Sequence, residues 1–479
     1  MARSTFRFWF TIIAVPSLLV VSALGYLAWR QSVPGIRASL DPVPRWIGVK
    51  TPLAVDLRAA RGGVRSVGIR LRQGSAKVVI VQQAFTGSPT NDQRVALQIT
   101  GATLGGLREG AATLEVLARD GFWRPIRVDD RPILTTQVTL DFTPPSLEVV
   151  AATRYWAQGG GGLVVLRSKG ASRVAVTVGG LAFRAYPAGP PESSLFVDLV
   201  ALPWDYEAGT PITAVAHDEA GNVTSRTVAV EVKARRFKTD TIEIKDEFLE
   251  RKLPELLPER AGTIAAGDLL AAFLTVNRDR RRQAEEVKRA LADKTQPRPL
   301  WEGAFVQPRN TKVFSNFAET RTYRYHGQVV DTQIHFGYDL AAVQQSPVPA
   351  ANSGMVVFTG PLSIYGNAVV VDHGLGLQTL YAHLSSIAVK EGEQVAKEQE
   401  LGRTGSTGLA LGDHLHYEVL INGVSVTPLE WWDARWIRDH VGRPLREANL
   451  PLIQSVMPAA TGDDPGQAAA RRRRAARSR

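Results

Sequence analysis

The spacing of hydrophobic residues changes along the chain, and the changes divide it into regions. From about residue 46 to 235, short runs alternate apolar with polar residues or are rich in β-branched residues, as in VRSVGIRLR, ATLEVLARD and TVAVEV. Runs of this length at near-regular spacing predict all-β sandwiches. The pair Pro144-Pro145 ends one strand and gives a stiff entry to the next unit. We therefore expect two sandwiches, at 46–142 and 143–235.

The spacing becomes helical over residues 245–295 and returns to a β pattern afterwards. Apolar residues fall at helical intervals at Leu269, Leu270, Phe273, Leu274, Ala284, Val287 and Leu291. This pattern predicts a connector of two or three short helices. Residues 297–443 are rich in β-branched residues and glycine, which predicts a second β region. Residues 444–479 are polar and end in an arginine run, which is typical of a disordered basic tail.

The N-terminal segment is apolar for long enough to cross a membrane. Residues 8–29 carry no charge and as a helix would extend about 33 Å, against a hydrocarbon core of about 30 Å. Arg3 and Arg7 precede the segment, and Trp9, Tyr26 and Trp29 suit the two interfaces. The alternative is a cleaved signal peptide, for which Ala23-Leu24-Gly25 is a poor cleavage site. Residues 1–30 are thus expected to form a membrane anchor or signal segment, followed by an extracytoplasmic chain.

The amino-acid composition excludes several kinds of functional site, whereas the net charge says little about function. The 479 residues include no cysteine, which excludes disulfides, thiolate metal sites and a cysteine nucleophile. The formal charge of +11 falls to +5 without the six arginines of the last nine residues. This remaining charge is ordinary for a chain of this length, so we expect no nucleic-acid partner.

The histidines indicate a site in the second β region, because seven of the eight lie between His326 and His440. A catalytic zinc site takes three nitrogen or oxygen ligands and leaves one position for water. His335, Asp339 and one further histidine would supply that set without cysteine. His414 and His416 are two residues apart on an expected strand, so both would face one cleft. His383, in the segment YAHL, is a third candidate.

Other residues of this region have weaker signals. His373, in VDHGLG, is expected to fix a turn, and His326 is expected to be exposed or near the groove. Tyr323 and Tyr325 are candidates for lining the groove or for donating to a developing oxyanion. The chain has no His-Glu-x-x-His helix, so it lacks the glutamate base of that class of zinc peptidase.

In this region the sequence resembles the lysostaphin-like (LytM-type) family of zinc peptidases, which cut peptide bonds in bacterial peptidoglycan. The resemblance covers about residues 298–436 and includes HFGYDLA, YGNAVVVDHGLGLQTLYAHLSSI and GDHLHYEV. It implies that His335, Asp339 and His416 hold one Zn²⁺ and that His383 and His414 are the catalytic pair. Which of the two activates water stays open. A TPP entry and a D-x-AGN turn also resemble those of bacterial immunoglobulin-like modules.

The expected fold is mainly β, with an N-terminal transmembrane helix, two immunoglobulin-like sandwiches, a short helical connector and a C-terminal peptidase domain. The resemblance implies an inner-membrane, single-pass endopeptidase whose catalytic domain cleaves peptidoglycan cross-links in the periplasm. The sandwiches would set its reach or dock envelope proteins. We also expect residues 40–235 to be dispensable for the chemistry. The alternatives are a non-catalytic protein that binds peptidoglycan and activates another hydrolase, and a carbohydrate adhesin with a vestigial catalytic domain.

Overall fold

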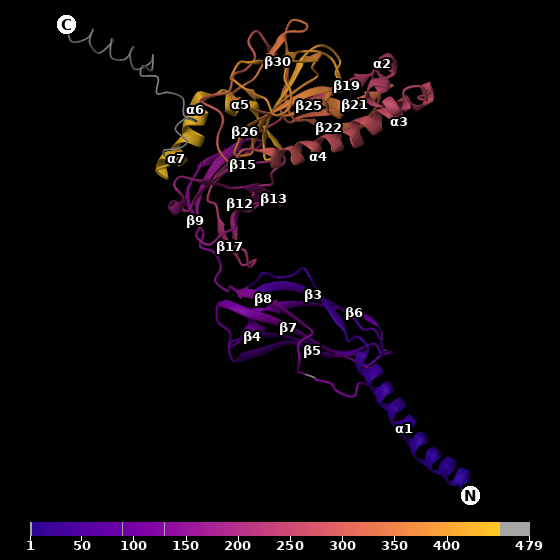
Figure 1. Ribbon diagram of the computed structural model, residues 1–479. Helices are drawn as coiled ribbons and strands as arrows, with labels where there is room; N and C mark the ends of the chain where they lie inside the picture. Colours follow the sequence, from indigo (N-terminus) through magenta and orange to yellow (C-terminus); the bar gives the residue numbers. More distant parts are fainter. Residues whose placement is uncertain (1, 89, 129, 451–479) are drawn as a thin grey trace, which may run out of the picture. The chain divides into compact units, whose positions relative to one another are not determined.

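The computed structural model describes residues 2–88, 90–128 and 130–450, without the side chains of residues 2–13 and Ala266. The chain divides into two compact units, formed by Met1–Pro145 with His217–Val223 and by Ser146–Ala216 with Thr224–Arg479. The first break follows Pro145, and the predicted domain bounds stay a prediction. Strands predominate, so the fold is mainly β, as the sequence predicts (Figure 1).

The first unit begins with the 31-residue helix α1 (Ala2–Ser32). Among the residues whose side chains are described, no helix is long and apolar enough to cross a membrane. The predicted span over residues 8–29 finds no support here. Residues 8–13 of that span lie outside the described side chains.

The rest of the first unit is a sandwich of two sheets, with strand orders β1-β3-β6 and β2-β8-β7-β4-β5. Its strands are β1 (Arg37–Asp41), β2 (Trp46–Ile47), β3 (Lys50–Arg58), β4 (Val64–Gln73), β5 (Ala76–Ala84), β6 (Asp92–Thr100), β7 (Gly110–Asp120) and β8 (Leu134–Leu140). Alternate residues of β3, including Leu53, Val55 and Leu57, are buried between the sheets. This core contains residues of the first sandwich alone.

The second unit starts with another sandwich, whose sheets have the orders β14-β15-β11-β9 and β13-β12-β16-β17 beside the pair β10-β18. Its strands are β9 (Glu148–Ala152), β10 (Tyr155–Ala157), β11 (Gly161–Arg167), β12 (Arg173–Val178), β13 (Leu181–Arg184), β14 (Tyr186–Ala188), β15 (Leu195–Ala201), β16 (Ile212–His217), β17 (Val223–Thr227) and β18 (Glu231–Lys233). The immunoglobulin-like class of both sandwiches stays a prediction.

The region between this sandwich and the last β region contains a strand and helices. They are β19 (Thr239–Ile244), α2 (Asp246–Leu256), α3 (Leu269–Leu274), a π-helical turn (Thr275–Arg280) and α4 (Arg281–Leu291). β19 pairs in parallel with β21 (Glu319–Tyr325), which also pairs with β22 (Gln328–His335). β19 thus belongs to a sheet whose other strands lie after residue 297, while the predicted bounds of the peptidase domain stay a prediction.

The last β region is built on a large sheet with the order β20-β23-β31-β27-β26-β25-β29, and β32 pairs with β31. Its strands are β20 (Lys312–Ser315), β23 (Tyr338–Ala341), β25 (Gly354–Pro361), β26 (Asn367–Gly374), β27 (Leu377–Ala382), β29 (Gln394–Val395), β31 (Leu415–Ile421) and β32 (Val424–Val426). A smaller sheet contains β24 (Pro347–Pro349), β30 (Glu400–Arg403) and β28 (Ser386–Ile387).

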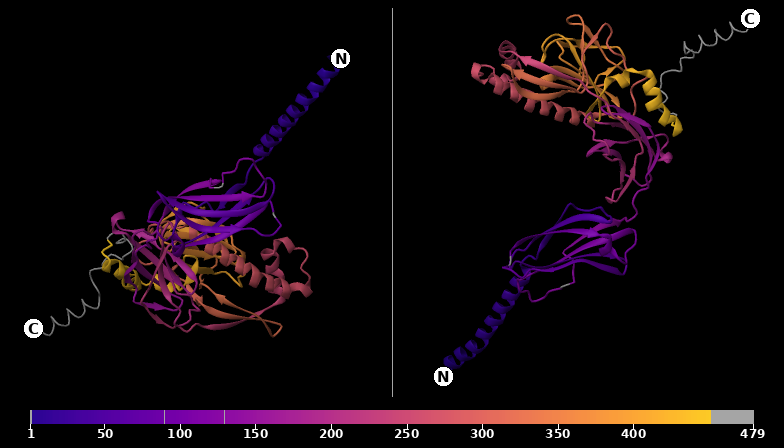
Figure 2. Two further views of the ribbon diagram at one scale, coloured as in Figure 1. Left: turned by 90° about the horizontal axis from the view of Figure 1, so that it is seen from below. Right: turned by 180° about the vertical axis from the view of Figure 1, so that it is seen from behind.

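The central strands of the large sheet are buried on both faces, and alternate residues face different cores. In β26, Val369 and Val371 belong to a core that continues into the second sandwich, whereas Ala368 and Val370 belong to the core formed with α2, α3 and α4. Side chains two apart on a strand share a face. In β31, Tyr417 therefore faces the sandwich side and its neighbours in sequence face the helices, which run along the sheet in Figure 2.

The C-terminal part of the described chain differs from the prediction of a disordered tail over 444–479. After α5 (Pro428–Trp432), α6 (Ala434–Trp436) and a π-helical turn, α7 spans Arg443–Glu447. Leu445 and Leu450 are buried in the core shared with the second sandwich. Apolar side chains within a mostly polar stretch thus anchor residues 444–450, and residues 451–479 lie outside the described part.

Candidate active site

Three neighbouring strands bring most of the candidate residues together. β23 pairs with β31 so that Asp339 lies opposite His416, and β27 places Ala382 on the other side of His416. His383 directly follows β27, and His414 directly precedes β31 in a bridge with Gly405. Residues far apart in sequence therefore meet because their strands are adjacent in the sheet.

His335 reaches the same place from the end of β22. The two residues between β22 and β23 include Gly337, where a Cβ would lie 2.7 Å from Nε2 of His416 and 2.6 Å from the carbonyl oxygen of Tyr417. Only glycine fits such a close approach of the backbone. The glycine in HFGYD thus lets the chain cross over His416 and present both His335 and Asp339 to it.

His335, Asp339 and His416 form a buried cluster of three ligand atoms. Nε2 of His335 and Nδ1 of His416 each lie 2.9 Å from Oδ1 of Asp339 and 3.0 Å from each other. Two imidazole nitrogens and one carboxylate oxygen are a ligand set that catalytic zinc accepts. The structure thus brings together the three residues that the sequence suggested as ligands.

The other ring nitrogens of the two histidines define which atoms carry protons. Nδ1 of His335 lies 2.9 Å from the carbonyl oxygen of Asn316, and Nε2 of His416 lies 2.9 Å from Oε1 of Glu418. Since both partners accept hydrogen bonds, these nitrogens are the donors of the neutral rings. The three atoms that face one another are then all acceptors, an arrangement that a bound cation stabilises. The cluster therefore fits a metal ion.

The electrostatics of the cluster favour ionised Asp339 and neutral His335. Burial would raise the pKa of Asp339, but the neighbouring His335, His414 and His416 hold it well below its usual value. Burial lowers the pKa of His335 to about 4. Nη2 of Arg321 donates to Oδ2 of Asp339 at 2.7 Å, which leaves Oδ1 for the cluster. Burial would lower the pKa of His416, but its partners Asp339 and Glu418 raise it. Metal binding requires a carboxylate and neutral imidazoles, so His416 would give up a proton when an ion binds.

His383 and His414 lie side by side next to this cluster, with ring centroids 4.8 Å apart. Nδ1 of His383 lies 2.8 Å from the carbonyl oxygen of Thr407, and Nδ1 of His414 lies 2.8 Å from that of Gly412. Each neutral ring thus keeps its proton on Nδ1 and leaves Nε2 as a base. Burial lowers the pKa of His383 well below its usual value, and the nearby His414 and His416 lower it further.

A groove of about 440 Å³ opens beside the cluster. A substrate in this groove could reach both the candidate ligands and the two neighbouring histidines. Asp339, His383 and His414 lie in its lining, and Ile242, Phe248 and Phe273 from β19, α2 and α3 line another part. Aromatic and aliphatic side chains with a few polar groups are typical of binding grooves. The connector therefore contributes to the wall of the groove.

The two candidate tyrosines have different positions. Tyr323 lines the groove, as predicted, whereas the ring of Tyr325 stacks on exposed His326 with centroids 4.0 Å apart. His373 is buried, with Nδ1 2.8 Å from the carbonyl oxygen of Ser353 and Nε2 2.8 Å from Oγ1 of Thr379. Its place in the fold fits the structural role that the sequence predicts.

Three residues that contact the site, Glu418, Lys288 and Arg321, were not among the candidates predicted from the sequence. Glu418 is fully buried and binds Nε2 of His416, and Oε2 of Glu418 lies 2.9 Å from Nζ of Lys288 in α4. Arg321 binds Asp339 from β21. The signal for Glu418 was available in the spacing His-x-Glu on one strand, since the two residues share a face. Nothing in the sequence pairs Lys288 with a residue 130 positions away.

The comparison with protein families places a known domain over this site. Residues 333–428 match the profile of peptidase family M23, and all five candidate residues fall within that range. The C-terminal region of the chain therefore carries a peptidase family M23 domain, of the LytM/lysostaphin family.

Relatives of known name agree with this assignment. The chain is 33% identical over 221 residues to the DD-carboxypeptidase/endopeptidase Mpg of Neisseria meningitidis serogroup B, a match that covers 44% of this chain and 51% of that protein. It is 37% identical over 145 residues to the peptidoglycan DD-endopeptidase ShyA of Vibrio cholerae serotype O1, covering 30% and 29% respectively. The chain thus spans about half the length of the first of these relatives and less of the second.

A solved structure also matches part of this chain. The catalytic domain of lysostaphin from Staphylococcus simulans is 26% identical, with 26% of this chain and 92% of that domain covered, and the TM-score is 0.22.

Proposed function

We propose that the chain is a zinc-dependent endopeptidase that cleaves peptide cross-links of bacterial peptidoglycan. The observation that carries the proposal is the buried cluster of three ligand atoms beside two imidazoles whose Nδ1 atoms face backbone carbonyl oxygens, open to a groove. The names of the relatives, a DD-carboxypeptidase/endopeptidase and a peptidoglycan DD-endopeptidase, support the substrate class.

In this proposal His335, Asp339 and His416 hold one Zn²⁺, and His383 and His414 handle protons. Zn²⁺ held by these three residues would supply a Lewis acid that polarises the scissile carbonyl and lowers the pKa of a bound water to about 7. Nε2 of His383 or His414 accepts a proton as the nucleophile forms, and an imidazolium can return it to the leaving amine. Arg321 keeps Asp339 ionised and oriented. Which of His383 and His414 acts first stays open.

The complete set of ligand and proton-handling residues favours an enzyme over the alternative of a non-catalytic activator. The test is to incubate the full chain with purified sacculi and to identify the released muropeptides by mass spectrometry. We expect cleaved cross-links, loss of turnover after chelation and recovery with zinc. A zinc-loaded, folded protein that releases nothing but stimulates another wall hydrolase would establish the alternative.

Two histidine variants separate metal binding from proton handling. His416→Ala should lower both zinc occupancy and turnover, because two remaining protein ligands hold the ion poorly. His414→Ala should keep zinc and lose about 10²–10⁴ in rate, the usual contribution of a positioned acid or base. Zinc stoichiometry measured beside turnover, with circular dichroism to confirm folding, decides between them. Retained zinc in His416→Ala would reverse the assignment.

The location of the enzyme is part of the proposal and rests on the sequence of residues 8–29. We propose an inner-membrane anchor with the peptidase in the periplasm, and envelope proteins as partners of the β-sandwiches. Cell fractionation with intact-mass analysis tests this. A soluble mature chain that starts near Tyr26 would contradict the anchor.

A further inference from the structure

Lys288, on α4, is a fully buried charge within the core that covers the active-site face of the sheet. Nζ of Lys288 lies 2.8 Å from Oε1 of Glu285, 2.9 Å from Oε2 of Glu418 and 3.0 Å from the hydroxyl of Tyr365. The three ammonium protons thus each have an acceptor. A buried lysine with this set of partners fixes the position of Glu418, since an unpaired buried carboxylate is costly.

Glu418 transmits this constraint to the ligand cluster. Its Oε1 accepts a hydrogen bond from Nε2 of His416 at 2.9 Å, which leaves Nδ1 of His416 facing His335 and Asp339. A second partner, Oγ of Ser425, donates to Oε2 of Glu418 at 2.7 Å. Partners of this kind orient a ligating histidine and select its tautomer. Hydrogen bonds and an ion pair therefore connect Lys288 on α4, through Glu418, to the candidate ligand His416.

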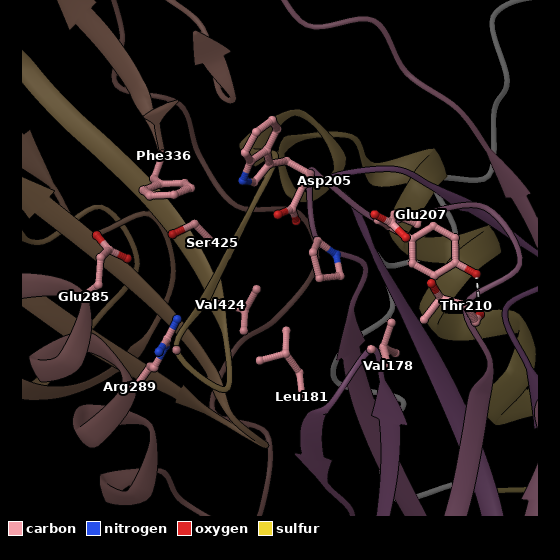
Figure 3. Close-up of a pocket in the computed structure, with 15 residues that line it drawn as sticks. Val178, Leu181, Asp205, Glu207, Thr210, Glu285, Arg289, Phe336, Val424 and Ser425 are labelled. Atoms are coloured by element: carbon pink, nitrogen blue, oxygen red, sulfur yellow. Dashed lines mark hydrogen bonds between the residues drawn. The ribbon is translucent and has the colours of Figure 1, made fainter. Parts of the chain in front are cut away.

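The opposite side of this network borders a cavity of about 530 Å³ (Figure 3). Glu285 and Ser425 line it together with Val178 and Leu181 of the second sandwich. Lys288 and Glu418 are themselves fully buried, so replacing Lys288 alone leaves a buried carboxylate without its cation and should lower stability. Replacing both residues together removes that charge, so we expect the double variant to stay folded.

A second series of hydrogen bonds connects α2 to His383, one of the two proposed proton-handling residues. Oε1 of Glu255 accepts a hydrogen bond from the backbone N–H of Gly408 at 2.6 Å, and buried Lys252 binds both Glu255 and the carbonyl oxygen of Ser406. Between these two anchored residues lies Thr407, whose carbonyl oxygen accepts the Nδ1 proton of His383. Glu255 thus holds the loop that sets the tautomer of His383.

We propose that Lys288 and Glu255 are positioning residues of the peptidase, the first for the ligand atom of His416 and the second for the ring of His383. The helical connector then contributes to the active site, although all five candidate ligand and proton-handling residues lie after residue 320. This inference rests on the proposed function, and its zinc-binding part does not depend on turnover.

The first experiment compares Lys288→Met with wild type in the full chain. We expect zinc affinity, measured by competition with a chelator, to fall about 10–100-fold, the usual loss when a metal ligand loses an outer partner. The double variant Lys288→Met/Glu418→Gln removes the unpaired charge, so it should regain stability while its zinc affinity stays low. The control is Lys294→Met, which replaces a half-exposed connector lysine that binds the Val357 carbonyl oxygen and should change neither quantity.

The second experiment compares Glu255→Ala with Glu255→Gln. Glu255→Ala should keep wild-type zinc affinity and KM and lose about 10-fold or more in kcat, because the Thr407 carbonyl is no longer fixed. Glu255→Gln retains an acceptor for the Gly408 N–H and should restore most of kcat. In spectra of 15N-histidine protein loaded with zinc, the Nδ1–H signal of His383 should exchange slowly in wild type and quickly in Glu255→Ala.

The outcomes separate this inference from the proposed function. A wild-type chain that cleaves no peptidoglycan would overturn the function, while zinc affinity and the His383 signal would still test the two positioning residues. A folded Lys288→Met protein with wild-type zinc affinity would overturn the role of Lys288. An unchanged His383 signal in Glu255→Ala, or an equal loss of zinc affinity, would overturn the role of Glu255.

Discussion

The two β-sandwiches have similar sequence patterns but different relations to the rest of the chain. The core of the first contains only residues of its own unit, such as Val55, Ile69 and Val116. The core of the second continues through Leu199 and Trp431 into the peptidase sheet. Similar alternating patterns thus produce an independent module in one case and half of a larger core in the other.

Polar contacts add to this difference. Oε2 of Glu430, at the end of the peptidase region, accepts a hydrogen bond from the backbone N–H of Gly161 in β11. The hydroxyl of Thr153 likewise donates to the carbonyl oxygen of His440. The expectation that residues 40–235 are dispensable as a block therefore needs revision. We now expect the second sandwich to stabilise the catalytic region and only the first to be dispensable for the chemistry.

The largest expected effect comes from matched leucines in the two cores. Leu199→Ala in β15 and Leu71→Ala in β4 each truncate a fully buried side chain and should cost about 2–5 kcal/mol. Because Leu199 belongs to the continuous core, its loss should lower the temperature at which the peptidase loses zinc and turnover. Leu71→Ala should leave both unchanged. The measurement is residual turnover and zinc content after heating, beside urea unfolding of each variant.

Equal losses of peptidase stability in the two leucine variants would break the comparison, since the first sandwich would then support the catalytic region as well. Wild-type heat resistance of the peptidase in Leu199→Ala would also contradict the comparison, since the second sandwich would then not stabilise the catalytic region. Circular dichroism at low temperature serves as the control that both variants fold.

A second prediction uses two buried glutamates whose pKa values shift in opposite directions. Burial raises the pKa of Glu430 from 4.5 to about 7. Its contribution to stability is therefore fully present below pH 4.5 and is lost as pH rises through about 7, by about 3 kcal/mol. Glu430→Gln should remove this dependence, which urea unfolding of the second unit at pH 5 and pH 8 will measure.

Glu115 in the first sandwich should behave in the opposite way. Burial would raise its pKa, but hydrogen bonds from Arg72 and Arg70 lower it. Its contribution is thus present above pH 4.5 and lost as pH falls below the lowered folded value. The first unit should weaken in acid and the second at higher pH. The same slope for both units would contradict the assignment.

The predictability of the fold and the site differs for physical reasons. Strand patterns, the proline break and the His-x-x-x-Asp motif are local, so His335 and Asp339 could be proposed from their spacing. The choice of His416 as the third ligand came from the family resemblance. The pairing of β19 with β21, and of Lys288 with Glu418, depends on contacts between distant parts of the chain. A lysine in a helix with an apolar stripe also gives no sign that its charge is buried. Local patterns thus identified candidate ligands but not the residues that contact them from distant parts of the chain.

A smaller effect is expected where the backbone of the second sandwich meets the peptidase region. A Cβ at Gly160 would lie 2.3 Å from Oε1 of Glu430. Gly160→Ala should therefore displace that carboxylate and cost about 1–3 kcal/mol, as overpacking does. The control is Gly105→Ala in the first sandwich, where a Cβ meets nothing within 4 Å. Urea unfolding measures the change in stability of each variant. An unchanged free energy of unfolding in Gly160→Ala would show that Glu430 can move away at little cost.

The smallest expected effect is that of removing residues 1–145. A chain that begins at Ser146 keeps the second sandwich, the connector and every site residue, and retains the continuous core. Zinc stoichiometry and turnover on soluble muropeptides should therefore stay within about twofold of the full chain, since distant, independent parts contribute separately. A chain that begins at residue 236 is the contrasting case. It exposes the apolar residues that Leu199 and its neighbours cover, and we expect it to aggregate. A stable, active protein from residue 236 would show that the shared core is dispensable, whereas an inactive protein from Ser146 would show that the first sandwich acts on the chemistry.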